Sequence, residues 1–264
     1  MADDSLLHVA RIAAGEFVMG AAEGGDEDER PPHRAYVDEF CIGTYPVTNG
    51  EYAQFVRETG HPSPAICALP MMVSGERESE FRALAASYFW NNGTPPEGRD
   101  RHPVTLIRYE DAMAYCSWLA TRTSKPVRLP TEAEWERAAR GGLEGKHYPW
   151  GDTLDRGSAH FLASACAKAG CGTAPVGTYP ANGFQLYDMA GNVWEWVSDW
   201  YAPNYYERAQ YLNPQGPDNG LMRILRGGAW VNTDGRYLRC SYRHKVPPDS
   251  YAYSIGFRVA YSTK

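Results

Sequence analysis

The chain has 264 residues and a hydrophobic content of 43%, enough for one large domain with its own core. Its formal net charge of −6 argues against nucleic acid as a main partner. No run approaches the roughly 20 apolar residues of a membrane span, and the first residues lack the basic start of a secretory signal. We therefore expect a cytoplasmic protein with no membrane and no nucleic acid among its partners.

Aromatic residues make up 13% of the chain, beside 26 Gly and 19 Pro, and this combination predicts short strands joined by long ordered loops. The first two strands are expected within residues 6–20 and 35–42. The acidic segment between them, GGDEDERPPH at residues 24–33, is interpreted as a solvated loop. Further short extended segments are expected at residues 102–107, 127–129, 193–197, 221–225 and 255–261.

Helices are predicted over residues 51–59, over residues 109–121, from residue 131 to the glycines at 141–142, and, for one short helix, near residues 78–86. The first and third of the long helices begin with capping boxes, Thr48 with Glu51 and Thr131 with Glu134, in which each side chain bonds the other residue's backbone N–H. The second has its apolar residues on one helical face. Short strands and a few helices within long loops predict one α+β domain over residues 1–264.

The aromatic stretch at residues 184–201, FQLYDMAGNVWEWVSDWY, is the most informative part of the chain. It holds three tryptophans, and its alternating residues predict a strand that follows a turn. The turn directs backbone carbonyls and the carboxylates of Asp188 and Glu195 toward one point. Ca²⁺ binds six to eight such oxygens, so a cation site is one interpretation. The alternative is that the tryptophans are core residues and the acids are surface caps.

The six cysteines form no C-x-x-C pair and no zinc-ligand spacing. Cys116 lies in an apolar helical pattern and is predicted to be a core residue. Cys166 and Cys171 either close a short disulfide or stay reduced, and a cytosolic location favours the reduced form.

Ordered motifs along the chain resemble the formylglycine-generating (sulfatase-modifying factor) family, which has a C-type-lectin-like core. These motifs include GEFVMGA, PVTNGEYAQF, RLPTEAEWERAARGG, GFQLYDMAGNVWEWVSDWY, RILRGGAW and SIGFRVAY, and they extend from about residue 15 to residue 261. The resemblance implies a structural Ca²⁺ site made by the side chains of Asp188 and Glu195 and the carbonyls of Gly191 and Val193. A second Ca²⁺ site of many relatives would fall near His160, Phe161, Lys168 and Gly170. We expect it to be absent, because a Lys ammonium repels a cation.

The family's copper-dependent oxidation of a substrate cysteine to formylglycine requires two cysteine thiolates, since Cu(I) is a soft ion. Here Asn232 stands where the first of these cysteines is expected, and the second is missing. Ala229 replaces a motif serine, and Cys240 aligns with a structural cysteine. The resemblance therefore implies the fold without copper-dependent formylglycine formation.

Two classes of function remain open. One is an oxidoreductase-related member with altered chemistry, for which His244 and Arg243 are the catalytic candidates. The resemblance extends to non-haem iron enzymes such as sulfoxide synthases and an oxidase of pyoverdine maturation. Such chemistry would require a redox metal, iron or copper. The sequence gives no support for one, because it contains no start of a facial-triad motif.

The other class is a non-catalytic binding module, either a pseudoenzyme or a protein like the variable proteins of diversity-generating retroelements. Its C-terminal loop would bind a peptide, a protein or a small molecule, because Tyr, Arg and Trp are the usual recognition residues. The predicted pocket residues are Trp194, Trp230, Asn232, Arg243, Asp249 and Ser250.

Overall fold

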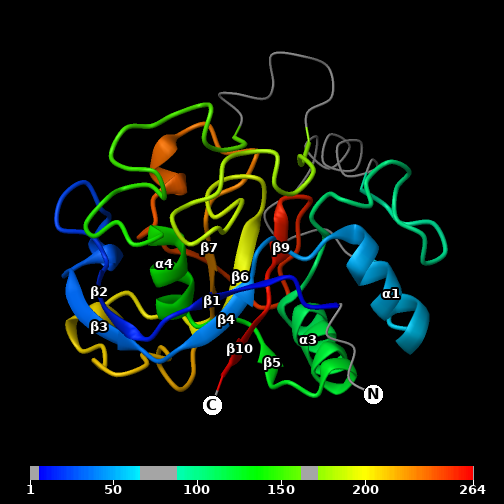
Figure 1. The fold of residues 1–264 in the computed structure, drawn as a ribbon, viewed down its shortest axis with the longest axis horizontal. Helices are drawn as coiled ribbons and strands as arrows, with labels where there is room; N and C mark the ends of the chain where they lie inside the picture. Colours follow the sequence, from blue (N-terminus) through cyan, green and yellow to red (C-terminus); the bar gives the residue numbers. More distant parts are fainter. Residues whose placement is uncertain (1–5, 66–87, 162–171, 264) are drawn as a thin grey trace.

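The computed structural model describes residues 6–65, 88–161 and 172–263. The strands are β1 (Val9–Ile12), β2 (Gly15–Met19), β3 (His33–Val37), β4 (Phe40–Gly43), β5 (Val127–Arg128), β6 (Trp194–Trp200), β7 (Arg223–Arg226), β8 (His244–Val246), β9 (Ile255–Phe257) and β10 (Ala260–Ser262). The helices are α1 (Asn49–Thr59), α3 (Tyr109–Thr123) and α4 (Glu132–Arg140), with short 3₁₀ turns η2 (Glu27–Glu29), η3 (Tyr205–Glu207) and η4 (Gly235–Leu238). The predicted α+β class of short strands, few helices and long loops is confirmed (Figure 1).

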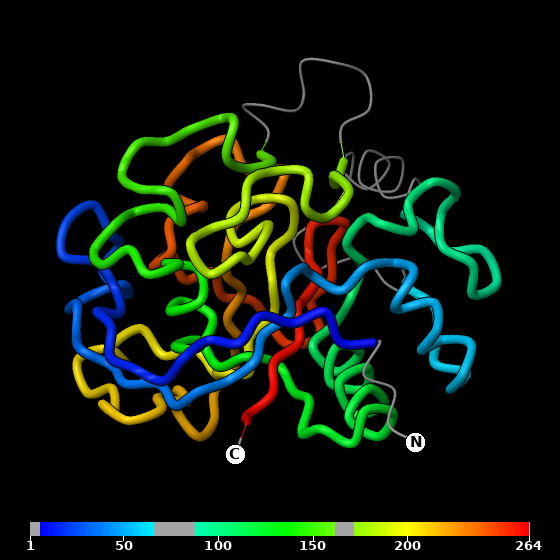
Figure 2. The backbone as a smooth tube through the Cα atoms, in the orientation of Figure 1, coloured from blue at the N-terminus to red at the C-terminus, as the bar shows by residue number. Residues whose placement is uncertain are grey.

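The described strands form three sheets. One has the order β1-β4-β10-β5, the second pairs β2 with β3, and the third has the order β8-β7-β6-β9. The first sheet brings the two ends of the chain together, because β10 pairs antiparallel with β4. The tube in Figure 2 shows the same juxtaposition, with the final red strand crossing the early blue strands.

Strand β6 lies at the centre of the fold, and its two faces meet different helices. Trp194 and Trp196 belong to the apolar cluster that also contains α1 and α3 side chains. Val197 belongs to the cluster around α4, and Glu195 contacts Trp135 of that helix. Because successive strand side chains point to opposite faces, β6 joins the two halves of the core.

The two predicted capping boxes are present. Thr48 accepts the Glu51 N–H at 3.3 Å, and Glu51 accepts the Thr48 N–H at 2.8 Å. The same reciprocal pair, Thr131 with Glu134, opens α4. Helices α1 and α4 end at Gly60 and Gly141, both in the left-handed conformation. Their backbone N–H groups donate hydrogen bonds to carbonyls of the last turn, which would otherwise lack a partner.

The structure corrects the strand predictions and the loop prediction. Residues 6–20, 35–42 and 255–261 were each expected to form one strand, but each region contains all or part of two strands. Two residues without regular structure separate them, and the second strand pairs with different partners. The acidic segment at residues 24–33 is not simply a solvated loop, because Asp28 and Glu29 are buried. Their burial is explained by ion pairs from distant segments, described below.

Several predicted features fall outside the described residues, namely the short helix near residues 78–86, Cys166, Cys171, Lys168 and Gly170. Residues 102–107 contribute a single backbone bridge, from Pro103 to Thr48. Among the helices that the structure describes, none is both long and apolar enough to cross a membrane.

Candidate functional site

The turn before β6 contains the four residues predicted to bind calcium. Asp188 adopts a left-handed conformation, with φ of 55°, and its Oδ2 accepts the Gly177 N–H at 2.8 Å. Gly191 has φ of 79°, and a Cβ added there would lie 2.4 Å from the His160 carbonyl oxygen. A glycine is therefore required at the point where this turn meets the neighbouring loop.

Glu195 is fully buried and forms a two-point ion pair with Arg258. Its Oε2 lies 2.6 Å from Arg258 Nε and its Oε1 lies 2.8 Å from Arg258 Nη2. The Trp135 indole N–H donates to Oε2 at 2.7 Å. This carboxylate therefore has a structural role within the protein chain itself.

The donor set of the turn nevertheless fits a hard cation. Burial raises the pKa of Asp188 to about 6, with a further contribution from the Glu195 carboxylate and an opposing one from Arg258. Two buried carboxylates with one guanidinium leave a net negative charge, which a divalent cation would compensate. Among residues 6–65, 88–161 and 172–263, no three His, Cys, Asp or Glu side chains converge as a metal site. A calcium ion here would depend on the backbone carbonyls of Gly191 and Val193.

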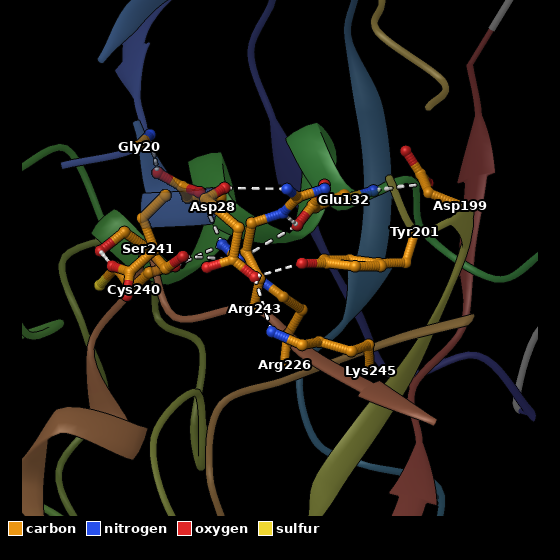
Figure 3. Close-up of polar contacts among 12 residues, drawn as sticks. Gly20, Asp28, Glu132, Asp199, Tyr201, Arg226, Cys240, Ser241, Arg243 and Lys245 are labelled. Atoms are coloured by element: carbon orange, nitrogen blue, oxygen red, sulfur yellow. Dashed lines mark hydrogen bonds and ion pairs between the residues drawn. The ribbon is translucent and has the colours of Figure 1, made fainter. Parts of the chain in front are cut away.

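A buried network of carboxylates and guanidinium groups joins α4, β7 and the segment before β8 (Figure 3). Arg226 Nη2 lies 2.6 Å from Glu136 Oε2, and its Nη1 lies 3.2 Å from Glu132 Oε1. Arg243 Nε lies 2.7 Å from the same Glu132 oxygen, and its Nη2 lies 3.1 Å from the other one. Burial alone would raise the pKa of Glu136, but Arg140 and Arg226 hold that pKa below its ordinary value.

This network extends to the acidic segment. Glu29 is fully buried, pairs with Arg239 and accepts the Ser241 hydroxyl at 2.6 Å. Asp28 accepts from both the Tyr201 hydroxyl and Lys245 Nζ, at 2.7 and 2.8 Å. The acids at residues 28–29 therefore anchor the loop that follows β7. Sequence reasoning missed this, because acidic residues in a glycine-rich turn are normally exposed.

Arg243 was predicted to be a pocket or catalytic residue, but the structure buries it within this network, with an exposure of 2%. Its guanidinium is occupied by Glu132 and by the Asp28 carbonyl. Asp249 is exposed, and Ser250 is partly exposed. The predicted pocket residues are thus divided between the interior and the surface.

Four side chains form what we call the aromatic face, namely Trp194, Tyr237, Tyr242 and His244. The His244 ring stacks on Trp194 at a centroid distance of 4.8 Å. Tyr242 and Tyr237 pack edge to face at 5.1 Å, and both contact Trp194. Burial, with the nearby Lys245 charge, lowers the pKa of His244 to about 4, so its imidazole is neutral at neutral pH.

Trp230 lies in a separate cluster, with Tyr88, Leu106 and Tyr251. Its exposure is 2%, and its backbone N–H donates to Asn192 O. The structure therefore does not bring Trp230 into direct ring contact with the aromatic face.

Asn232 closes a tight turn in the loop after β7. Its Oδ1 accepts the Ala229 N–H at 2.6 Å, and its own N–H donates to Ala229 O at 3.0 Å. Cys240 is buried, and burial raises the pKa of its thiol to about 12. Cys116, predicted to be a core residue, is also buried, with its pKa raised to about 12. Neither thiol is ionised at neutral pH.

The histidine expected near a second calcium site is occupied by protein contacts. His160 Nε2 lies 2.7 Å from Gly172 O, and its Nδ1 lies 3.2 Å from the Tyr179 hydroxyl. The adjacent Phe161 is fully buried.

The fold and this site define a single-chain α+β scaffold in which a glycine turn and a buried ion-pair network support a long C-terminal loop. The sulfatase-modifying factor enzyme 1-like domain matches residues 2–263, so the chain belongs to that family. The resemblance deduced from the sequence motifs is confirmed.

The chain is similar to relatives that carry different names. The chain is 38% identical to the formylglycine-generating enzyme of Streptomyces coelicolor, covering 95% of this chain and 88% of the relative. It is 33% identical to the inactive C-alpha-formylglycine-generating enzyme 2 of Mus musculus, covering 98% of this chain and 86% of the relative. Among solved structures, PvdO from Pseudomonas aeruginosa superposes with a TM-score of 0.79 at 27% identity, over 96% of this chain and 94% of that protein.

Proposed function

We propose that this protein keeps the family fold but does not oxidise cysteine to formylglycine with copper. The observation that carries the proposal is the loop after β7. Its residues 229–239 contain no cysteine, and Asn232 uses its amide to close a turn. Cys240 is a buried thiol rather than a thiolate, and Cu(I) binds thiolates. The mouse relative is named as an inactive formylglycine-generating enzyme, which supports the existence of inactive members of the family.

The direct test is oxidation of a cysteine-containing sulfatase peptide, with Cu(I) and O₂ supplied and the product followed by mass spectrometry. The Streptomyces coelicolor relative is the positive control. With this chain, we expect no more conversion of the peptide than in a reaction without protein. Conversion well above that background would refute the proposal.

We further propose that the aromatic face binds a peptide or protein partner. Tyr237, Tyr242 and His244 are each partly exposed, on a scaffold fixed by buried ion pairs. Aromatic side chains on a rigid support lose little conformational entropy on binding, and they are typical of recognition surfaces.

The test compares partners captured by the wild type, by Tyr237→Ala and by a control, Tyr211→Ala. Tyr211 is 52% exposed and lies outside the aromatic face, so the control removes the same ring from another surface. Trp230→Ala is less suitable, because Trp230 is buried and its loss would disturb the core. We expect Tyr237→Ala alone to lose its partners. Unchanged capture by Tyr237→Ala would contradict the proposed role of the face.

An oxidoreductase-related function with altered chemistry is the second candidate, and one observation favours it. The imidazole of His244 is partly exposed and neutral, so one ring nitrogen keeps a lone pair with which to bind a metal ion. Metal analysis of the purified protein separates the candidates. Stoichiometric iron or copper, lost in His244→Ala, would support the enzyme, whereas calcium alone would support the binding protein.

We also infer that Asp188, Gly191, Val193 and Glu195 hold a structural Ca²⁺ ion, and that the protein acts in the cytoplasm. Support for calcium comes from the two buried carboxylates, Asp188 and Glu195, which share one guanidinium, and from the glycine-dependent turn between them. The melting temperature should fall when a chelator is added. Asp188→Asn keeps an oxygen ligand and should preserve this response, while Asp188→Ala should abolish it. A melting temperature that is indifferent to chelator in the wild type would disprove the calcium site.

A further inference from the structure

A cavity of about 410 Å³ is lined by residues of β5, β10, the first turns of α3 and the start of α4. Figure 1 shows β5 and β10 near the C terminus, whereas the orange η4 turn beside the aromatic face lies in the upper part of the molecule. None of the residues that line the cavity belongs to the aromatic face or to the turn at residues 188–195. Its volume is within the range of about 300–1,000 Å³ that is usual for small-molecule sites.

The cavity walls are fixed by hydrogen bonds and an ion pair within the protein. Asn213 Oδ1 accepts the Asp38 N–H at 2.8 Å, and Asn213 Nδ2 donates to Asp38 Oδ2 at 3.2 Å. Arg128 forms a two-point ion pair with Glu134, at 2.6 and 2.7 Å, and also donates to Ser262 Oγ at 3.0 Å. A ligand would therefore meet a preformed site, which reduces the entropic cost of binding.

The charges of the lining exclude anions. Its only basic side chain is Arg128, whose charge is already neutralised by Glu134, and it also contains Asp38 and Glu39. A phosphate or carboxylate would meet these acids, while the two nearby guanidinium groups are engaged elsewhere: Arg128 pairs with Glu134, and Arg223, outside the lining, donates to the Ser198 carbonyl and lies over the Tyr109 ring. The cavity therefore selects against negatively charged ligands.

The surroundings also disfavour a cation. Glu39 is paired with Arg11 at 2.7 Å, so part of the acidic charge is compensated. The guanidinium of Arg223 lies 4.2 Å from the centre of the Tyr109 ring, which is the aromatic ring of the lining. A ligand cation near Tyr109 would be repelled by Arg223, whose guanidinium already occupies a face of the Tyr109 ring.

The remaining lining groups suit hydroxyl groups. The hydroxyls of Thr131 and Ser262 each accept one hydrogen bond within the protein, and that of Ser198 donates to Asp199. A hydroxyl makes more than one hydrogen bond, so each retains capacity for a ligand, and Gln215 provides an amide that both donates and accepts. Tyr109 and Met113 supply an apolar wall, with Met113 37% exposed. From this combination we propose that the cavity binds a neutral polyhydroxylated molecule of the size of a mono- or disaccharide.

The proposal is tested by saturation-transfer NMR on the full chain, with glucose, galactose, mannose and maltose as probes. Gluconate and spermidine, which both carry observable C–H protons, serve as the anionic and cationic comparisons. We expect transfer to at least one neutral saccharide and none to gluconate or spermidine. Transfer to none of the saccharides, or to spermidine or gluconate instead, would overturn the proposed ligand class.

Two variants test the location. Gln215→Ala removes an exposed amide from the rim, and Met113→Ala removes the exposed apolar wall, so both should fold normally. Each should weaken saccharide binding roughly two- to tenfold, as expected for one lost contact. Gln54→Ala, on the exposed side of α1, is the matched control and should bind like the wild type. Equal binding by all three variants would overturn the assignment of this cavity.

Discussion

Glu195 and Arg258 form a fully buried ion pair, and removing Glu195 should destabilise the protein strongly even without calcium. In Glu195→Ala, the Arg258 guanidinium would stay buried without its counter-charge, and the Trp135 indole would lose its acceptor. Breaking one side of a buried pair costs about 3–5 kcal/mol, against a total stability of about 5–15 kcal/mol. For a chain of this size, that loss corresponds to a fall in melting temperature of roughly 6–20 °C.

The assay is urea unfolding of Glu195→Ala, Arg258→Ala and the double variant, each with and without chelator. Because the double variant leaves no stranded charge, its loss should be clearly smaller than the sum of the single losses. Glu58→Gln is the control, since its carboxylate pairs with Arg122 at the surface and should have little effect. Additive losses, or a loss below about 1 kcal/mol for Glu195→Ala, would refute the reasoning. A loss that disappears entirely in chelator would assign the role of Glu195 to calcium instead.

Three further predictions concern buried groups. Burial, with neighbouring carboxylates, raises the pKa of Asp199 from 3.8 to about 7. The folded protein therefore holds this proton more tightly than the unfolded chain does. The stability that results, on the order of a few kcal/mol, should be lost as the pH rises from about 4 to 7. Asp199→Asn should flatten this slope in urea titrations. Gly191→Ala should lower the free energy of unfolding by at least about 1–3 kcal/mol, because it combines a positive φ with a backbone clash. Glu29→Gln should cost about 3 kcal/mol by leaving buried charge unpaired, and it should speed hydrogen exchange at residues 235–242.

Each of these has its own control. A pH slope unchanged by Asp199→Asn would assign the titration to another group. Gly98 has φ of 74° but open space around it, so Gly98→Ala should cost less than Gly191→Ala, and equal losses would contradict the clash. Glu27 is exposed in the same turn as Glu29, so an equal effect of Glu27→Gln would show that burial is not the cause.

Local sequence signals predicted the helices well, because their information is contained within a few residues. The capping boxes at Thr48 and Thr131 satisfy backbone groups one turn away, and Gly60 and Gly141 end the helices through their own backbone conformation. The alternation at residues 193–197 predicted β6 for the same reason. Strand pairing was not predicted, because β4 and β10 are more than 200 residues apart in sequence and no local pattern specifies such a partner.

The family relationship and the absence of cysteine from residues 229–239 followed from the sequence alone, since both are properties of residue order. Only the tertiary structure decided where the charges lie. It buried Arg243 against Glu132, buried Glu29 under Arg239, and paired Glu195 with Arg258. A charged side chain is stable in the interior only beside its partner, and in each pair that partner comes from a segment at least 60 residues away. The sequence shows that the charges are present, but only the folded chain shows which of them neutralise each other and which remain for a ligand.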